Sequence, residues 1–209
     1  MKTFVFQGDS ITDVHRDYRN DDNSGAGYPT LVAARLGLSH PGDYRFLNRG
    51  VSGDRIVDLN ARIKRDIINL KPDVLSILIG INDVWHELAD SPNGVDNEKF
   101  FRTYCEVLRE IKAACPAVKI YILEPFVLKA AATEENWSYF ARETRLRAAS
   151  AKKAADLCGC RFLPLQNRFD VLCEKAEPAY WLRDGVHPTA MGHQVIADEL
   201  IRAVEEDIE

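Results

Sequence analysis

The sequence lacks any apolar run long enough to span a membrane, and it lacks the marks of a disulfide-rich or zinc-binding scaffold. A membrane helix needs about 20 consecutive apolar residues, and no segment of the chain approaches this length. There are five cysteines, an odd number, and they form no CxxC pair. This pattern argues against both a disulfide framework and a zinc site.

An excess of positive charge is also absent. The chain has 27 Lys and Arg against 32 Asp and Glu, a formal net charge of -5, so nothing favours a nucleic-acid or anionic-membrane partner. The apolar stretch before Gly8 is too short for a signal-peptide core and has no small-residue cleavage site. We therefore expect a cytoplasmic protein. Because no linker, repeat or low-complexity segment interrupts the chain, residues 1–209 are expected to form a single domain.

Short β-branched or aromatic runs alternate with longer segments of helical periodicity. This alternation predicts a parallel sheet with helices on both faces, a three-layer α/β/α fold. The five expected strands are Thr3–Phe6, Tyr44–Leu47, Val74–Ile79, Lys119–Leu123 and Arg161–Leu163. The expected helices are Tyr28–Leu36, Ile56–Leu70, Glu98–Ala114, Glu134–Leu157, Leu165–Lys175 and Thr189–Glu205.

A serine follows the first expected strand, in the segment GDSIT at residues 8–12. A serine at a tight glycine turn just past a strand can expose its hydroxyl at the carboxyl edge of the sheet. The same residues are typical of a helix N-cap, and this segment alone favours the cap.

Two further polar segments follow the second and third expected strands. The segment NRGVSGDR at residues 48–55 contains glycines that allow a sharp turn and an accessible backbone amide. In GIND at residues 80–83, the asparagine can direct its amide at an oxyanion. Each segment is equally compatible with an ordinary loop or an Asx turn.

The segment WLRDGVHP at residues 181–188 precedes the last expected helix. Asp184 lies three residues before His187, a spacing that lets the carboxylate hold one ring nitrogen while the other faces a nucleophile. A local Asp-His hydrogen bond with no chemistry is the alternative. A nucleophile elbow of the GxSxG type is absent, which argues against an ordinary α/β-hydrolase.

Taken together, the four segments resemble those of the SGNH hydrolases, also called GDSL esterases. GDS at residues 8–10, Gly53, GIND at residues 80–83 and the closing Asp184-x-x-His187 match the family's four blocks in order, between residues 4 and about 193. Ile11 stands where the family name expects leucine, a mild apolar exchange. In motif detail the segments are most similar to those of intracellular acetylxylan esterases.

The resemblance implies a flavodoxin-like sheet and a triad that works without metal or other cofactor. Ser10 would attack an ester carbonyl, His187 would act as base and Asp184 would orient it. The oxyanion would be held by the backbone amides of Ser10 and Gly53 and by the Asn82 side chain. The resemblance also implies that copies of the chain can form a homo-oligomer.

Five residues near these segments are weaker candidates for contact with substrate: Asp9, Arg55, Trp85, His86 and Trp181. Either tryptophan could stack on a sugar ring, although core packing explains them equally well. The expected activity is hydrolysis of short acyl esters, above all acetyl esters of xylo-oligosaccharides or related sugars. A broad carboxylesterase, lysophospholipase or thioesterase is the alternative enzyme. A catalytically silent binding module is the third hypothesis, and the intact four blocks argue against it.

Overall fold

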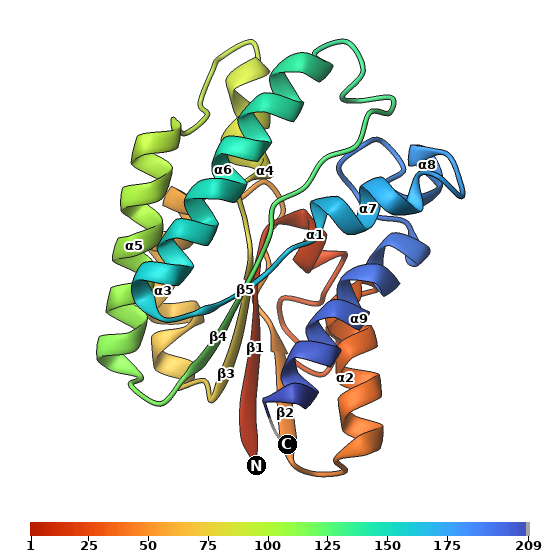
Figure 1. Cartoon of the computed structure of the whole chain (residues 1–209). Helices are drawn as coiled ribbons and strands as arrows, with labels where there is room; N and C mark the ends of the chain where they lie inside the picture. Colours follow the sequence, from red (N-terminus) through yellow and green to blue (C-terminus); the bar gives the residue numbers. More distant parts are fainter. Residues whose placement is uncertain (208–209) are drawn as a thin grey trace.

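The computed structural model describes residues 1–207, and these contain one five-stranded sheet with helices on both faces (Figure 1). All strand pairs are parallel and the spatial order is β2-β1-β3-β4-β5. The expected three-layer α/β/α fold is thereby confirmed. The strands are β1 (Lys2–Gly8), β2 (Tyr44–Asn48), β3 (Val74–Leu78), β4 (Lys119–Leu123) and β5 (Arg161–Leu163).

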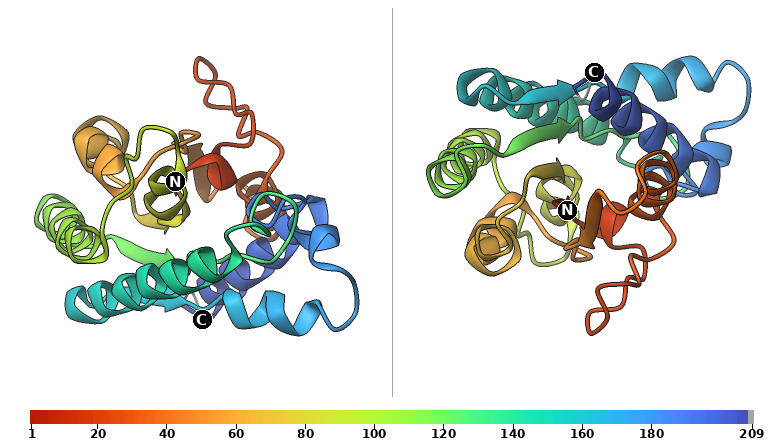
Figure 2. Two further views of the ribbon diagram at one scale, coloured as in Figure 1. Left: turned by 90° about the horizontal axis from the view of Figure 1, so that it is seen from above. Right: turned by 90° about the horizontal axis from the view of Figure 1, so that it is seen from below.

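Helices α3, α5 and α6 cover one face of the sheet, and α2 and α9 cover the other (Figure 1). The segment between α1 and α2, red-orange in Figure 2, projects from the body. The helical elements are α1 (Ser10–Asp13), α2 (Tyr28–Ser39), α3 (Ile56–Asp66), η1 (Ile68–Leu70), α4 (Ile81–Trp85), η2 (His86–Leu88), α5 (Asn97–Ala114), α6 (Trp137–Cys158), α7 (Gln166–Leu172), α8 (Pro178–Trp181) and α9 (Ala190–Glu206).

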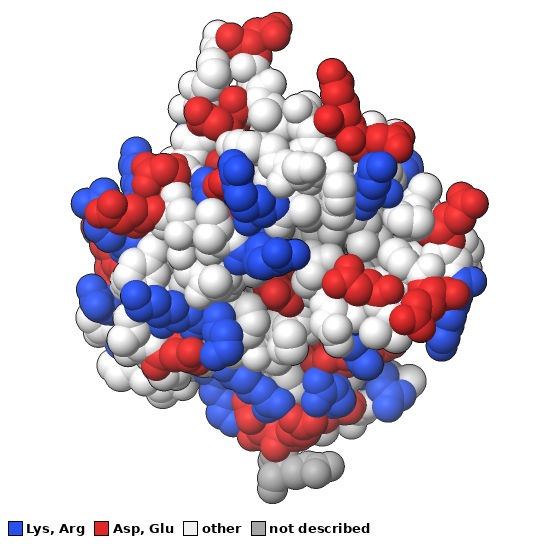
Figure 3. Space-filling model, turned by 45° about the horizontal axis from the view of Figure 1, so that its top comes forward, with Lys and Arg blue, Asp and Glu red and all other residues white. Residues whose placement is uncertain are grey.

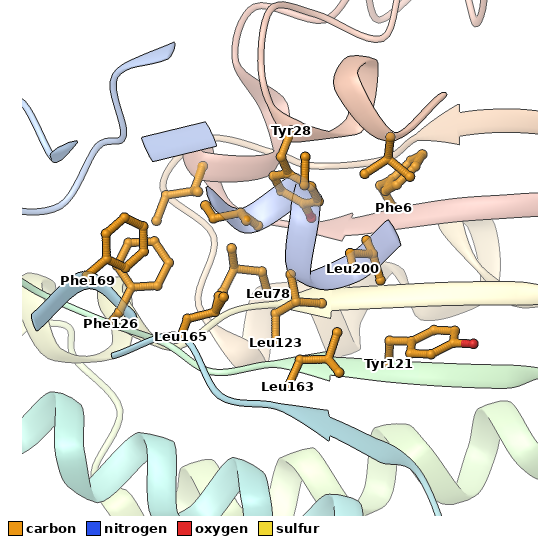
Figure 4. Close-up of a cluster of buried hydrophobic side chains, with 14 of the residues drawn as sticks. Phe6, Tyr28, Leu78, Tyr121, Leu123, Phe126, Leu163, Leu165, Phe169 and Leu200 are labelled. Atoms are coloured by element: carbon orange, nitrogen blue, oxygen red, sulfur yellow. The ribbon is translucent and has the colours of Figure 1, made fainter. Parts of the chain in front are cut away.

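The apolar runs form strands because their side chains can be buried on both faces of the sheet. In β1, Phe4 and Phe6 pack in the cluster beneath α2 and α9, and Val5 packs in the cluster beneath α3 and α5. All three are fully buried, and each such burial stabilises the fold by about 1.5–3 kcal/mol. Figure 4 shows the first cluster, to which Leu78 and Leu123 contribute from neighbouring strands.

The strand order creates a switch point at the carboxyl ends of β1 and β3. The chain leaves β1 toward β2 on one side, and β3 lies on the other side. Open α/β sheets bind their ligands at such a point, because the two connecting loops diverge there and leave a crevice. Ser10 follows β1 and Asn82 follows β3, so both predicted site residues are placed at this crevice.

Several predicted helix boundaries were wrong. The helix that begins at Tyr28 runs through Gly37 to Ser39. A glycine inside a helix costs about 1 kcal/mol relative to alanine, and the packing of α2 along α9 offsets that cost. The helix expected at residues 56–70 ends at Asp66 and is followed by a separate 3₁₀ turn. Helix α6 begins at Trp137 rather than at Glu134, and α7 spans only residues 166–172.

The surface carries both signs of charge, and acidic and basic side chains are interspersed over the face drawn in Figure 3. Among residues 1–207, no helix combines the length and apolar character needed to cross a membrane. All five cysteines are free thiols.

Candidate active site

Ser10 is the first residue of α1 and follows β1 by two positions. The preceding Asp9 is the N-cap, because its Oδ1 accepts a hydrogen bond from the Ile11 amide at 2.9 Å. The cap expected from the sequence is therefore real, but the capping side chain is that of Asp9. The Ser10 hydroxyl remains available and lies 3.0 Å from Nε2 of His187.

A compact loop holds His187 against Asp184. The Asp184 Oδ1 accepts hydrogen bonds from the amides of Val186 and His187, at 2.9 and 2.8 Å, and its Oδ2 lies 2.7 Å from Nδ1 of His187. Gly185 has a φ of 97°, and a Cβ there would lie 2.5 Å from the Leu128 carbonyl oxygen. This close approach requires glycine. Ser10 is thus joined in one hydrogen-bonded line to His187 and Asp184, which lie more than 170 positions further along the chain.

The electrostatics of the pair suit a base held by a carboxylate. Burial tends to raise the pKa of Asp184, but the hydrogen bonds from His187 and Val186 prevail and hold it below its usual value. The pKa of His187 is raised by its hydrogen bond to Asp184, although partial burial opposes this. An ionised Asp184 accepts the Nδ1 hydrogen and leaves the Nε2 lone pair of a neutral imidazole directed at Ser10.

Backbone and side-chain donors lie beside the serine. Gly53 has a φ of 86° with open space where a Cβ would be, so its conformation rather than crowding selects glycine. Within residues 1–207 the backbone amides of Ser10 and Gly53 have no hydrogen-bond acceptor. Asn82 is buried, and its Nδ2 donates to the Asp54 carbonyl at 3.1 Å. Since an amide nitrogen carries two hydrogens, one remains for a ligand.

These groups line a pocket of about 430 Å³. Trp85 forms part of its wall, with its ring centroid 5.9 Å from that of His187. The neighbouring His86 also lines the pocket, and its pKa is lowered by partial burial and by the nearby Arg55 charge. The complete lining comprises Ser10, Ser52, Gly53, Asn82, Trp85, His86, Leu88, Ala89 and His187.

Three of the expected substrate contacts, Asp9, Arg55 and Trp181, are not among the residues that line this pocket, and their contact with substrate stays a prediction. Asp9 is 1% exposed and is not among the lining residues, and burial raises its pKa to about 7. Arg55 forms an ion pair with Asp58, with 2.8 Å between Nε and Oδ2, and does not line the pocket. Trp181 packs against the core, and its buried indole nitrogen has no hydrogen-bond partner among residues 1–207.

Sequence reasoning also missed residues that support the site. Ser52, in the second sequence segment, lines the pocket, and its hydroxyl donates to Asp13 Oδ2 at 2.7 Å. Leu88 and Ala89 form an apolar part of the wall, and no motif marked them. Asn48, the last residue of β2, holds α1 in place, because its Nδ2 donates to the Thr12 carbonyl at 2.6 Å. Its position in the second segment was the only available signal.

No group of three or more His, Cys, Asp or Glu side chains suited to hold a metal ion occurs within the described residues 1–207. The pocket instead joins a hydroxyl, an imidazole and a carboxylate to a set of hydrogen-bond donors. This arrangement can activate a hydroxyl as a nucleophile and can stabilise a developing oxyanion beside it.

Comparison with known proteins identifies the family. The family model of the GDSL-like lipases and acylhydrolases matches residues 6–195, which include all four sequence segments. The chain belongs to this family. The predicted resemblance to SGNH hydrolases is thereby confirmed.

Individual relatives agree with the family model. The acetylxylan esterase of Geobacillus stearothermophilus is 31% identical over 207 residues, a match that covers 96% of this chain and 92% of the esterase. Its crystal structure superposes with a TM-score of 0.85, with 97% of this chain and 94% of that chain covered. A protein classed as a GDSL-like lipase from Parabacteroides merdae is 33% identical, with a TM-score of 0.92 and coverage of 98% and 95%. The protein is accordingly a carboxylic ester hydrolase with the SGNH hydrolase fold.

Proposed function

We propose that this hydrolase is a serine esterase that removes acetyl groups from xylo-oligosaccharides or related carbohydrates. The observation that carries the proposal is the line of contacts from Ser10 Oγ to His187 Nε2, at 3.0 Å, and from His187 Nδ1 to Asp184 Oδ2, at 2.7 Å. A hydroxyl bonded to a carboxylate-oriented imidazole is the arrangement that serine acyl transfer requires.

In the proposed acylation step, Ser10 Oγ attacks the ester carbonyl and His187 Nε2 takes the hydroxyl proton. The resulting oxyanion accepts hydrogen bonds from the amides of Ser10 and Gly53 and from Nδ2 of Asn82. When the tetrahedral intermediate collapses, His187 gives the proton to the leaving sugar oxygen and acetyl-Ser10 remains. Water, deprotonated by His187, then attacks the acetyl-enzyme and releases acetate and free Ser10.

The similar Geobacillus esterase supports both the residues and the substrate class. It is named for activity on acetylated xylan. Structures have been solved for three of its catalytic mutants, in which a serine, an aspartate or a histidine is replaced by alanine. The mutated aspartate and histidine are three positions apart, as Asp184 and His187 are. The half-buried Trp85 and the polar His86 on the pocket wall suit the leaving sugar.

One observation favours a second candidate, a carboxylesterase of broader acyl preference. Leu88, which is 38% exposed, and Ala89 give the pocket an apolar margin that a longer acyl chain could contact. A series of aryl esters from acetyl to octanoyl separates the two candidates. We expect kcat/KM to be highest for acetyl, and a maximum at the long chains would reject the sugar-acetyl proposal.

The nucleophile is tested by the Ser10→Ala variant. Acetate release from acetylated xylo-oligosaccharides and from aryl acetates should fall by at least about 10⁴-fold, since the variant can form no acyl-enzyme. The matched control is Ser52→Ala, which removes a hydroxyl from the same pocket and should remain active. Full activity of the Ser10→Ala variant would disprove the mechanism.

A further inference from the structure

A second hollow lies at the carboxyl end of β4, between α6 and α7, and none of its residues lines the catalytic pocket. We call it the α6–α7 pocket. Its volume is about 250 Å³. On the α6 side it is lined by Trp137, Ala141 and Arg145, which are spaced by four residues and so share one helix face. The small Ala141 leaves a recess between the two larger side chains.

The opposite wall presents carboxylate oxygens in fixed positions. Glu124 Oε2 accepts hydrogen bonds from the backbone amides of Leu165 and Gln166, at 2.7 and 2.8 Å. Asp170 Oδ1 accepts a hydrogen bond from the Gln166 side chain at 2.9 Å. The other carboxylate oxygen of each acid has no partner within residues 1–207. Two acceptors on anchored side chains are therefore available at the pocket.

Arg145 supplies the complementary donors. Although it lines the same pocket as two acids, its guanidinium forms no ion pair with any residue from 1 to 207. With one cation and two anions around it, the pocket has charges of both signs and is not built for a strongly charged ligand. The Arg145 donors and the free carboxylate oxygens do not bind one another, so they are available to hydroxyl groups, which can both donate and accept hydrogen bonds.

The volume of the α6–α7 pocket and its aromatic wall restrict further the kind of ligand that it can bind. The volume lies below the range of about 300–1,000 Å³ that is usual for drug-sized ligands, so the pocket holds one small ring. Trp137 offers a rigid apolar surface with a polar edge, which can cover the C–H face of a sugar while the charged side chains bind its hydroxyls. Polar groups in small number on a largely apolar cavity are typical of small-molecule sites.

The α6–α7 pocket is connected to the loop of Asp184 and His187 by the chain segment that follows its lining residue Val127. Shortly after the lining residue Val127, Leu128 donates its amide to the Gly185 carbonyl at 2.9 Å. The amide of Ala132 likewise donates to the Asp184 carbonyl at 2.9 Å. On the other side, Phe140, adjacent to Ala141 in α6, makes an edge-to-face contact with Trp85 of the catalytic pocket at 5.8 Å. The first turns of α6 therefore lie between the two pockets.

From this geometry we infer that the α6–α7 pocket is a non-catalytic site for one neutral sugar ring, such as an unacetylated unit of a xylo-oligosaccharide. The choice of sugar rests on the proposed function. The site would bind the carbohydrate without ester chemistry, so it would add affinity for oligosaccharides and leave the hydrolysis of small aryl acetates unchanged.

The test uses unacetylated xylotriose as the probe and the indole N–H signals of the three tryptophans in a ¹H–¹⁵N spectrum. We expect titration with xylotriose to shift the Trp137 signal. The Ala141→Leu variant fills the recess and should raise the dissociation constant at least tenfold. The matched control is Ala149→Leu, at an exposed position of the same helix, which should bind as the unmodified protein does. Should Ala141→Leu not fold, Arg145→Ala at an exposed position is expected to weaken binding similarly.

Hydrolysis assays separate this inference from the proposed function. Both leucine variants should hydrolyse aryl acetates at the unmodified rate. If acetylated xylo-oligosaccharides are hydrolysed but xylotriose does not shift the Trp137 signal, or if Ala141→Leu binds it unchanged, the second site is refuted and the esterase proposal stands. If xylotriose binds at Trp137 but acetylated xylo-oligosaccharides are not hydrolysed, the proposed substrate is refuted and the second site stands.

Discussion

Replacing Asn82 by alanine should slow acyl transfer by about 10²–10³-fold while leaving KM nearly unchanged. In the structure the Asn82 amide is one of three donors beside Ser10, and only one of its two hydrogens is used, in the bond to the Asp54 carbonyl. The loss of a single oxyanion donor costs about 2.7–4 kcal/mol in the barrier. Because the oxyanion exists only in the transition state and the intermediate, the cost falls on kcat rather than on substrate binding.

The assay is steady-state hydrolysis of an aryl acetate, with kcat and KM measured separately. Ser52→Ala is the control from the same pocket wall: its hydroxyl is already donated to Asp13, so kcat should change by no more than a few-fold. The Asn82→Asp variant should be at least as slow as Asn82→Ala, because an ionised carboxylate at this position repels the oxyanion.

Stability must be checked in parallel, because Asn82 also has a structural bond. Its removal leaves the Asp54 carbonyl without that donor, which should lower the free energy of unfolding by about 1–3 kcal/mol in urea titrations. The protein would still be folded at 25 °C if its stability lies in the ordinary range of about 5–15 kcal/mol. A folded Asn82→Ala enzyme that loses less than about tenfold in kcat, or that changes only in KM, would refute the assignment of Asn82 to the oxyanion.

Two further variants test the electrostatics. His187 must be neutral to accept the serine proton, so activity should be lost as the pH falls through the pKa of His187. Because Asp184 raises this pKa, the acid limb of the kcat/KM profile should lie above pH 6.5, the ordinary pKa of histidine. Asp184→Asn should move that limb to lower pH and reduce kcat by about 10⁴-fold, and an unmoved limb would show that the carboxylate does not set it. Arg62→Leu removes the half-buried cation that pairs with Asp54 at 2.5 Å, so the free energy of unfolding in urea should fall by about 3–5 kcal/mol. Leucine at Arg102, whose ion pair with Glu98 is exposed on both sides, should change it by no more than about 0.5 kcal/mol, and equal losses in both variants would contradict this reasoning.

The fold and the contacts that join Ser10, His187 and Asp184 could be predicted because their signals are local and periodic. The buried strand Val74–Leu78 is almost wholly apolar, and each polar segment directly follows a strand, so parallel pairing alone brings Ser10 and Asn82 to one edge. His187 could be paired with Asp184 because the two are only three residues apart. None of these inferences needed the direction of a side chain to be known.

The pocket wall could not be predicted, since it depends on which way side chains turn. Trp85 and Trp181 flank their motifs in similar ways, but only the first reaches the pocket, because the second packs on the core beneath α9. The sequence held a signal for the ion pair of Arg55: Asp58 lies three residues further on, at the spacing of a helical ion pair. The position of Trp181 depends on packing against residues distant in sequence, whereas that of Arg55 depends on the nearby Asp58.

Two acidic residues of the sequence segments hold the loops that contain the proposed oxyanion donors. Asp9 holds the amide of Ile11, and Asp83 accepts the amide of Ile56 at 3.1 Å; burial raises the pKa of Asp83 to about 8. Neither carboxyl group lies on the pocket wall, but each fixes the loop that contains a donor, namely Ser10 or Gly53. The amides of Ile11 and Ile56 are bound by these acids, whereas within residues 1–207 the amides of Ser10 and Gly53 have no acceptor, so two free donors lie in loops that are held in place. Electrostatic preorganisation of this kind is usually the largest single contribution to acyl transfer, so under the proposed function these two acids would serve catalysis by fixing the donors rather than by contacting substrate.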